Sequence, residues 1–272
     1  MFKKILIGLA LVAIIGVLVF GAVSRTMAKN ETNSNPGSQG GNRYSDTQSD
    51  SLSDLVENGY GQVNHVEGFN DSIQQNLLSA SSGELSEAEI DALLYMREEE
   101  KLARDVYLAL GAQWDLPVFQ NISGSEQSHM DAIKVLLDRY ELIDPASSER
   151  GVFTNPELQA LYNDLIILGS QSLPDALKVG AAIEEIDILD LQSHLVDTDN
   201  ADIQQVFNSL LNGSTNHLRS FVSILSTQTG ETYIPQYLDD QVYQTIISTA
   251  MQTGGNGNGG VNRQGGSNRG QP

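Results

Sequence analysis

Four stretches of the chain repeat apolar residues at alternating steps of three and four, which is the spacing of the buried face of an amphipathic helix. They cover residues 93–110, 122–140, 177–195 and 203–224. Each stripe is interrupted near its middle by polar residues: Glu100 in the first, Glu126 and His129 in the second, Glu184 in the third, and Ser214 and His217 in the fourth. The pattern therefore predicts four helices that direct these polar groups into one core.

Capping and stop signals predict where the helices begin and end. Ser86 to Glu89 form a capping box, so the first helix is expected to begin there and to end at Gly111. Pro117 suits a first-turn position, and the second helix is expected to continue to about Tyr140. The other expected helices cover about 156–168, 172–196, 200–227 and 235–250.

The connections between these helices predict the topology. Short loops join the first and second major helices and the third and fourth, so each pair is expected to form an antiparallel hairpin. Residues 141–171 are long for a connection and predict one crossover that carries a short helix. Because no run alternates apolar and polar residues as a strand would, the predicted class is all-α. The expected architecture is an up-down four-helix bundle with one long crossover connection and extra short helices.

Both ends of the chain lack the residues of a core. Residues 1–28 hold a short basic start and an apolar run from Ile5 to Val23, which predicts a signal peptide or an N-terminal membrane anchor. Residues 29–83 predict a mostly disordered polar linker, and residues 252–272 a disordered tail rich in Gly and Asn. The folded unit is expected at 84–251, outside the cytoplasm, either secreted or anchored to the membrane by the N-terminal segment.

Charge and cysteine content narrow the classes of partner. A net charge of −20 makes nucleic acid and anionic lipid poor partners and favours cations, so membrane contact is expected only through an uncleaved N-terminal segment. Without cysteine, a metal site must use oxygen and imidazole nitrogen, which suits iron, manganese or zinc. Neither haem nor a nucleotide is expected as a cofactor, and a homodimer is compatible with the pattern.

The polar interruptions predict a metal site. Glu126 and His129 form a Glu-x-x-His unit, whose spacing puts both side chains on one helix face. A buried carboxylate must be paired, protonated or bound to metal, and three carboxylates with two imidazoles are most simply explained by cations. For His129 the alternative is a core histidine with satisfied hydrogen bonds.

Several neighbouring residues leave alternatives open. Glu99 competes with Glu100 for the inward position, and a solvated face is expected for Glu98 and one other glutamate of this run. Asp187 is either a further ligand or a member of a hydrogen-bond network. Ser214 stands where a second Glu-x-x-His unit would have its glutamate. Two residues of the first helix are expected beside the ligands: Arg104 as a partner of Glu100, and Tyr107 in contact with the site or packed in the core.

Several motifs resemble those of a known superfamily. Residues 100–107 resemble the Glu-x-x-Ala-Arg-x-x-Tyr segment of the first helix of rubrerythrins, and Glu126-x-x-His129 occupies the position of the second-helix motif in the ferritin-like superfamily. The stretch from about Leu85 to Leu225 resembles an uncharacterised family of that superfamily, the DUF2202 type. The hallmark segments are 98–105, 125–129, 183–187 and 216–221.

The resemblance implies a ferritin-like bundle with a carboxylate-bridged di-iron or di-manganese centre. It favours Glu100 over Glu99 and Glu184 over Glu185. Ser214 departs from the family pattern, and either Glu184 and Asp187 together compensate or the second metal position is weak. The ligands implied are Glu100, Glu126, His129, Glu184, Asp187 and His217.

Two functions of different classes follow. The first is an exported ferritin-like protein that binds one or two metal ions, with iron or manganese favoured over zinc, and that has oxidase- or peroxidase-type activity if it is an enzyme. A site that binds a single zinc or manganese ion through Glu126, His129 and His217 would lie between this function and a bundle without metal. The second is a metal-free binding or surface-interaction bundle, whose buried polar network Arg104 and Arg219 would satisfy.

Overall fold

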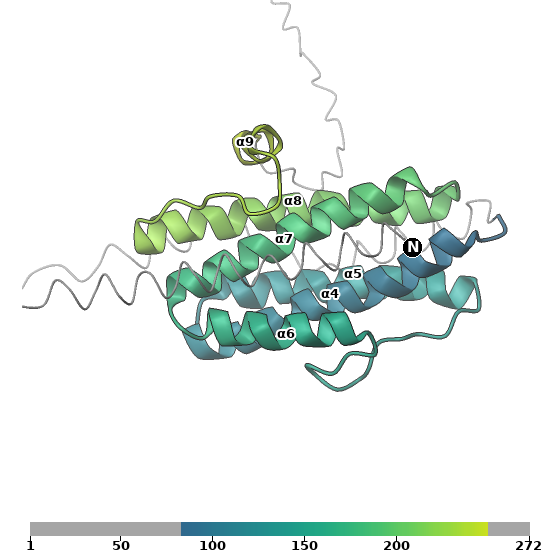
Figure 1. The fold of residues 1–272 in the computed structure, drawn as a ribbon, viewed down its shortest axis with the longest axis horizontal. Coiled ribbons are helices and arrows are strands. Elements are labelled where there is room, and N and C mark those ends of the chain that lie inside the picture. The colour runs from purple at the N-terminus through teal and green to yellow at the C-terminus, as the bar shows by residue number, and fades with distance from the viewer. Residues whose placement is uncertain (1–82, 250–272) are drawn as a thin grey trace, which may run out of the picture.

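The computed structural model describes residues 83–249, which form helices and no strand. The all-α class and the helical bundle are confirmed. The helices are α4 (Glu87–Trp114), α5 (Pro117–Arg139), α6 (Pro156–Gly169), α7 (Leu173–Val196), α8 (Ala201–Thr229) and α9 (Asp240–Ser248) (Figure 1).

The four long helices pack as two pairs. Helix α4 packs along α5 and α7 along α8, and the pairs meet where α4 contacts α7 and α5 contacts α8. Helix α6 lies outside this bundle against α4 and α7, and α9, seen end-on in Figure 1, contacts α8. The interior between the four long helices is therefore enclosed on all four sides.

Two apolar clusters fill the two ends of the bundle and show the direction of each helix. One cluster joins the N-terminal part of α4 to the C-terminal parts of α5 and α7 and the N-terminal part of α8. The other joins the opposite parts of these helices and includes α6. Helices α5 and α7 therefore run parallel to each other and antiparallel to α4 and α8. The connection through α6 carries the chain back along the bundle, as the long crossover predicted from the sequence (Figure 1).

Two helix ends differ from the sequence prediction. Helix α4 does not end at Gly111 but continues to Trp114 and stops at Asp115, whose φ of 50° is left-handed. Gly111 lies within the helix. A Cβ at this position would lie 3.1 Å from the Cβ of Phe119, so the glycine allows the start of α5 to pack closely against α4. Helix α9 begins only at Asp240, because Glu185 Oε2 accepts hydrogen bonds from the backbone N–H groups of residues 236–238 and holds that segment out of a helix.

The acidic run on α4 is buried, contrary to the solvated face expected for part of it. Glu98, Glu99 and Glu100 are each at most 5% exposed. Glu98 accepts hydrogen bonds from the N–H groups of Thr154 and Asn155, so it anchors the start of α6. The expectation fails because the loop before α6 folds back over this face of α4, a contact that helical periodicity does not reveal.

The expected leader at 1–28 and tail at 252–272 lie outside the described residues, as does the linker at 29–83 except for its last residue. Within 83–249, none of the helices combines the length and the apolar composition that a bilayer crossing requires.

Candidate metal centre

A layer of polar side chains separates the two apolar clusters at the middle of the bundle. Its members are all buried, and each of the four long helices contributes to it. They are Glu100 from α4, Glu126 and His129 from α5, Glu184 and Asp187 from α7, and Ser214 and His217 from α8. Three of the helices supply residues three positions apart, which a helix places on one face.

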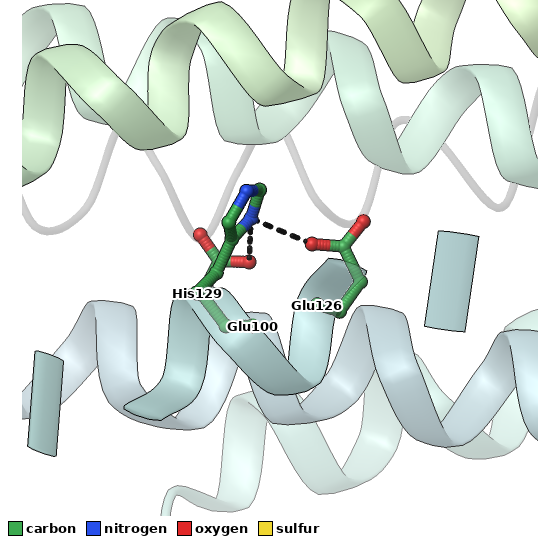
Figure 2. Close-up of side chains that lie close together, drawn as sticks. All are labelled: Glu100, Glu126 and His129. Carbon is green, nitrogen blue, oxygen red and sulfur yellow. Dashed lines mark hydrogen bonds and ion pairs between the residues drawn. The ribbon is translucent and has the colours of Figure 1, made fainter. Parts of the chain in front are cut away.

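One half of the layer is formed by Glu100, Glu126 and His129. The Nδ1 atom of His129 lies 3.1 Å from Glu100 Oε2 and 2.8 Å from Glu126 Oε2. Figure 2 shows both carboxylates directed at this nitrogen. One ligand atom from each residue lies within 4.8 Å of the others, so the three could hold a metal ion together.

The other half is formed by Glu126, Glu184 and His217, whose ligand atoms also lie within 4.8 Å of one another. His217 Nδ1 lies 2.9 Å from Glu126 Oε1 and 3.4 Å from Glu184 Oε2. Glu126 thus presents one carboxylate oxygen to each half. Burial opposes its charge, but the imidazoles of His217 and His129 lower its pKa below the usual range.

Neighbouring hydroxyl groups orient these side chains. Ser125 Oγ lies 3.0 Å from His217 Nε2, which leaves Nδ1 of the same ring directed at the carboxylates. The hydroxyl of Tyr107 donates to Glu184 Oε1 at 2.5 Å. Tyr107 therefore contacts the site directly while its ring packs on Phe221 in the core, so it fills both of the roles considered for it.

Asp187 lies beside the two halves rather than within either. Its Oδ2 accepts a hydrogen bond from the hydroxyl of Ser214. Among the described residues, its Oδ1 has no hydrogen-bond partner. Asp187 therefore takes part in a hydrogen-bond network through Oδ2 and keeps an unpaired, buried oxygen, Oδ1.

The spacing of the donor atoms is compatible with a bound cation. Glu126 Oε1 and His217 Nδ1 are close, yet neither makes a hydrogen bond of acceptable geometry within the described residues, and Glu100 Oε1 is also unpaired. Metal–ligand bonds of about 2.0–2.2 Å place adjacent ligand atoms roughly 3 Å apart. The separations of 2.8 to 3.4 Å around the two imidazoles match that spacing.

Burial and charge set the protonation of the site. Burial and the charge of Glu184 raise the pKa of Asp187 to about 8. Burial and the charge of Asp187 raise the pKa of Glu100 well above its usual value. Burial opposes a charge on His217, but Glu126 and Glu184 outweigh it and raise the pKa of this imidazole to about 10. Protons thus occupy the metal-free site, and binding of cations would release them.

Two arginines lie elsewhere than expected. The guanidinium of Arg104 donates to Asp105 and Gln127 rather than to Glu100. Arg219 donates to the carbonyl oxygen of Ile246 and to Asn216. Both side chains lie toward the rim of the bundle, so the buried Glu–Arg–His network of the metal-free alternative does not form through them.

Sequence reasoning overlooked Ser125 and Asp190. Ser125 precedes the Glu-x-x-His unit, and only the packing of α8 on α5 brings it to His217. Asp190 was detectable, because it lies three residues after Asp187 and therefore on the same face of α7. Asp190 lies beside Glu99, whereas Glu100 contacts His129. Both glutamates are therefore buried, and Glu100 is the one that reaches the polar layer with the histidines.

Comparison with known proteins gives the family. Residues 89–250 match the family model described as "Uncharacterized protein domain (DUF2202)". The chain belongs to the DUF2202 family. A similar member is the uncharacterized protein MJ0754 of Methanocaldococcus jannaschii, 49% identical over 173 residues that span 63% of this chain and 93% of that protein.

The same relative is represented among solved structures. The crystal structure of hypothetical protein MJ0754 from Methanococcus jannaschii matches with a TM-score of 0.62 and 48% identity, over 63% of this chain and 98% of that one. The family and the helical fold are thus shown, whereas membership of the ferritin-like superfamily stays a prediction. This relative carries no functional name, so the function is argued from the site.

Proposed function

We propose that this protein binds two divalent cations, iron or manganese, at the centre of its bundle, with Glu126 shared between them. One observation carries the proposal: two buried three-residue groups, each with two carboxylates and one imidazole, have Glu126 in common. A carboxylate that offers one oxygen to each of two neighbouring positions is the arrangement of a carboxylate-bridged metal pair.

Charge balance supports two ions rather than one. Glu100, Glu126, Glu184 and Asp187 offer four negative charges when ionised, which two divalent cations neutralise. With neutral imidazoles, such a buried site carries no net charge, so the penalty for burying the carboxylates is offset. The oxygen-rich donor set with one imidazole per position suits iron and manganese, and zinc remains compatible.

The surrounding residues prepare the site. Ser125 orients one imidazole, Tyr107 fixes one oxygen of Glu184, and Ser214 holds Asp187 with its other oxygen free. The apolar clusters above and below keep bulk water from the layer. Bound iron or manganese would supply one-electron chemistry toward dioxygen or peroxide, and we propose oxidase- or peroxidase-type activity on that ground. Export, by secretion or with a membrane anchor, is a further proposal that rests on residues 1–28.

The test is metal content of the full chain. Metal-free protein is loaded anaerobically with Fe²⁺, Mn²⁺ or Zn²⁺, freed of excess ions and assayed by elemental analysis. We expect two ions per chain in the wild type, at most a trace in Glu126→Gln, and two in Glu98→Gln. Glu98 is a buried glutamate two residues before Glu100 that anchors α6 instead.

The other outcomes are equally informative. One ion per chain, lost on His217→Ala, would contradict the shared-ligand reading and favour a mononuclear site. No bound ion in folded wild-type protein would refute the proposal and favour the metal-free interaction bundle.

A further inference from the structure

A line of polar side chains runs along the contact between α4 and α7, from the surface to the metal centre. We name these residues the α4–α7 seam: Asp91, Tyr95 and Glu99 on α4, with His194 and Asp190 on α7. The α4 members recur every four residues, and Asp187, Asp190 and His194 are three and four apart, so each set occupies one helix face. Exposure falls along the seam from Asp91, which is exposed, to Glu99, which is 5% exposed.

Contacts join the two sides of the seam. The hydroxyl of Tyr95 donates to Asp190 Oδ2 at 3.3 Å, and its ring lies 6.1 Å from that of His194. The carboxyl groups of Glu99 and Asp190 face each other across the seam and influence each other's pKa. The charge of Asp187 acts on both Glu99 and Glu100, so this aspartate links the seam to the metal centre.

The Glu99–Asp190 pair receives a hydrogen bond from the Tyr95 hydroxyl, but Glu99 has an unpaired oxygen and neither carboxylate has a basic partner among the described residues. Glu99 Oε2 is buried and has no hydrogen-bond partner within residues 83–249. None of the ion pairs formed by the described residues brings a lysine or arginine to either carboxylate. Two buried carboxylates in contact must share a proton or hold a cation.

Other buried acids outside the centre show the contrast. Each of them accepts hydrogen bonds from several backbone N–H groups or pairs with a basic side chain, and therefore has a structural role, although Glu185 Oε1 is itself unpaired within the described residues. They are Glu89 at Asp199 and Asn200, Glu98 at Thr154 and Asn155, Glu185 at residues 236–238, Asp105 at Lys101 and Arg104, and Asp202 at Tyr140 and Arg139. Within residues 83–249, the Glu99–Asp190 pair receives the Tyr95 hydroxyl but no backbone N–H group and no basic side chain.

We propose that Glu99 and Asp190 form a third cation site, through which divalent cations pass from the surface at Asp91 and His194 to the metal centre. The inference rests on the proposed dinuclear centre. Two carboxylates and a phenol hydroxyl suit hard divalent ions such as Fe²⁺ or Mn²⁺. The site has no imidazole, so it binds an ion more weakly than the centre does, and the free Oδ1 of Asp187 is the next oxygen along the route.

The test follows the rate of metal uptake. Metal-free full-length protein is mixed with Co²⁺ in a stopped-flow spectrophotometer, and the visible absorption of Co²⁺ bound by nitrogen and oxygen ligands is recorded. Clefts lined by one sign of charge raise on-rates by roughly 10–10³-fold, and each variant removes one charge of the pair. We therefore expect Glu99→Gln and Asp190→Asn to slow uptake by at least about fivefold, with a final content of two ions. Glu98→Gln, the same change one residue away, should load at the wild-type rate.

The outcomes separate the two proposals. Uptake slowed by less than fivefold in both variants, with two ions bound at the end, would overturn the route and leave the centre intact. No uptake by the wild type would overturn the centre itself. If Glu99→Gln does not fold, as judged by circular dichroism, Asp190→Asn at the less buried end of the pair gives the same test.

Discussion

Replacing Glu126 by glutamine changes the only residue that both halves of the candidate centre share, while keeping the volume of the side chain. An amide has one oxygen and no negative charge, so it cannot offer one anionic oxygen to each half. We therefore expect Glu126→Gln to lose both ions. Glu100→Gln, which affects only the half with His129, should lose one.

The expected size follows from the number of sites. An ion present at a hundredfold excess over its Kd stabilises the folded state by about 2.7 kcal/mol, so two independent ions give roughly 5 kcal/mol. In a folded unit of this size, each kcal/mol raises Tm by about 2–4 °C. Metal loading should therefore raise the Tm of the wild type by roughly 10–20 °C, that of Glu100→Gln by about half as much, and that of Glu126→Gln by almost nothing.

The assay is differential scanning calorimetry of metal-free and metal-loaded samples of each variant. The difference between the two Tm values is used because it cancels any destabilisation of the metal-free variant. Glu98→Gln serves as the control, since it loses stability at the α6 anchor but should keep the full metal-dependent rise. A wild-type rise in Glu126→Gln would refute the shared ligand, and equal losses in both ligand variants would refute the division into halves.

Three further perturbations probe the surroundings of the centre. Folding raises the pKa of Asp187 to about 8 and that of His217 to about 10, so the folded metal-free protein binds more protons than the unfolded chain. Its Tm should therefore fall as pH rises from about 7 to 10. A flat or rising profile would contradict the assigned charges. Gly213→Ala would place a Cβ 2.6 Å from His129 Nε2 and displace this imidazole, so elemental analysis should show one ion lost. The loss is expected although alanine stabilises a helix by about 1 kcal/mol relative to glycine. Two retained ions would show that the imidazole position is not tightly constrained. Ser214→Ala leaves Asp187 without its hydroxyl donor and should destabilise the metal-free protein by about 1–3 kcal/mol in urea unfolding, whereas an unchanged midpoint would show that the bond contributes little.

Periodicity predicted the parts of the site that depend on one helix at a time. The apolar stripes assign Glu100, Glu126, Glu184 and His217 inward positions, because the buried face of a helix repeats regularly along the sequence. The start of α4 was equally accessible, since Ser86 caps this helix through its own side chain and that of Glu89.

What periodicity missed depends on contacts between segments distant in sequence. Glu98 is buried only because the loop before α6 folds over α4, and nothing in the acidic run itself indicates that cover. The destination of Arg104 was misjudged for the same reason, because the position of Gln127 across the α4–α5 contact decides it. The pairing of Glu99 with Asp190 depends likewise on the alignment of α4 against α7.

The apolar clusters at the two ends of the bundle bear on how this protein could change over evolutionary time. Each cluster unites the four long helices without a candidate ligand from the polar layer, so the apolar contacts that hold the scaffold together are separate from the candidate metal centre. A mutation in the middle layer could therefore alter the ligand set of the proposed centre while the chain still folds. Descendants of one scaffold could thus diverge in chemistry while remaining alike in shape.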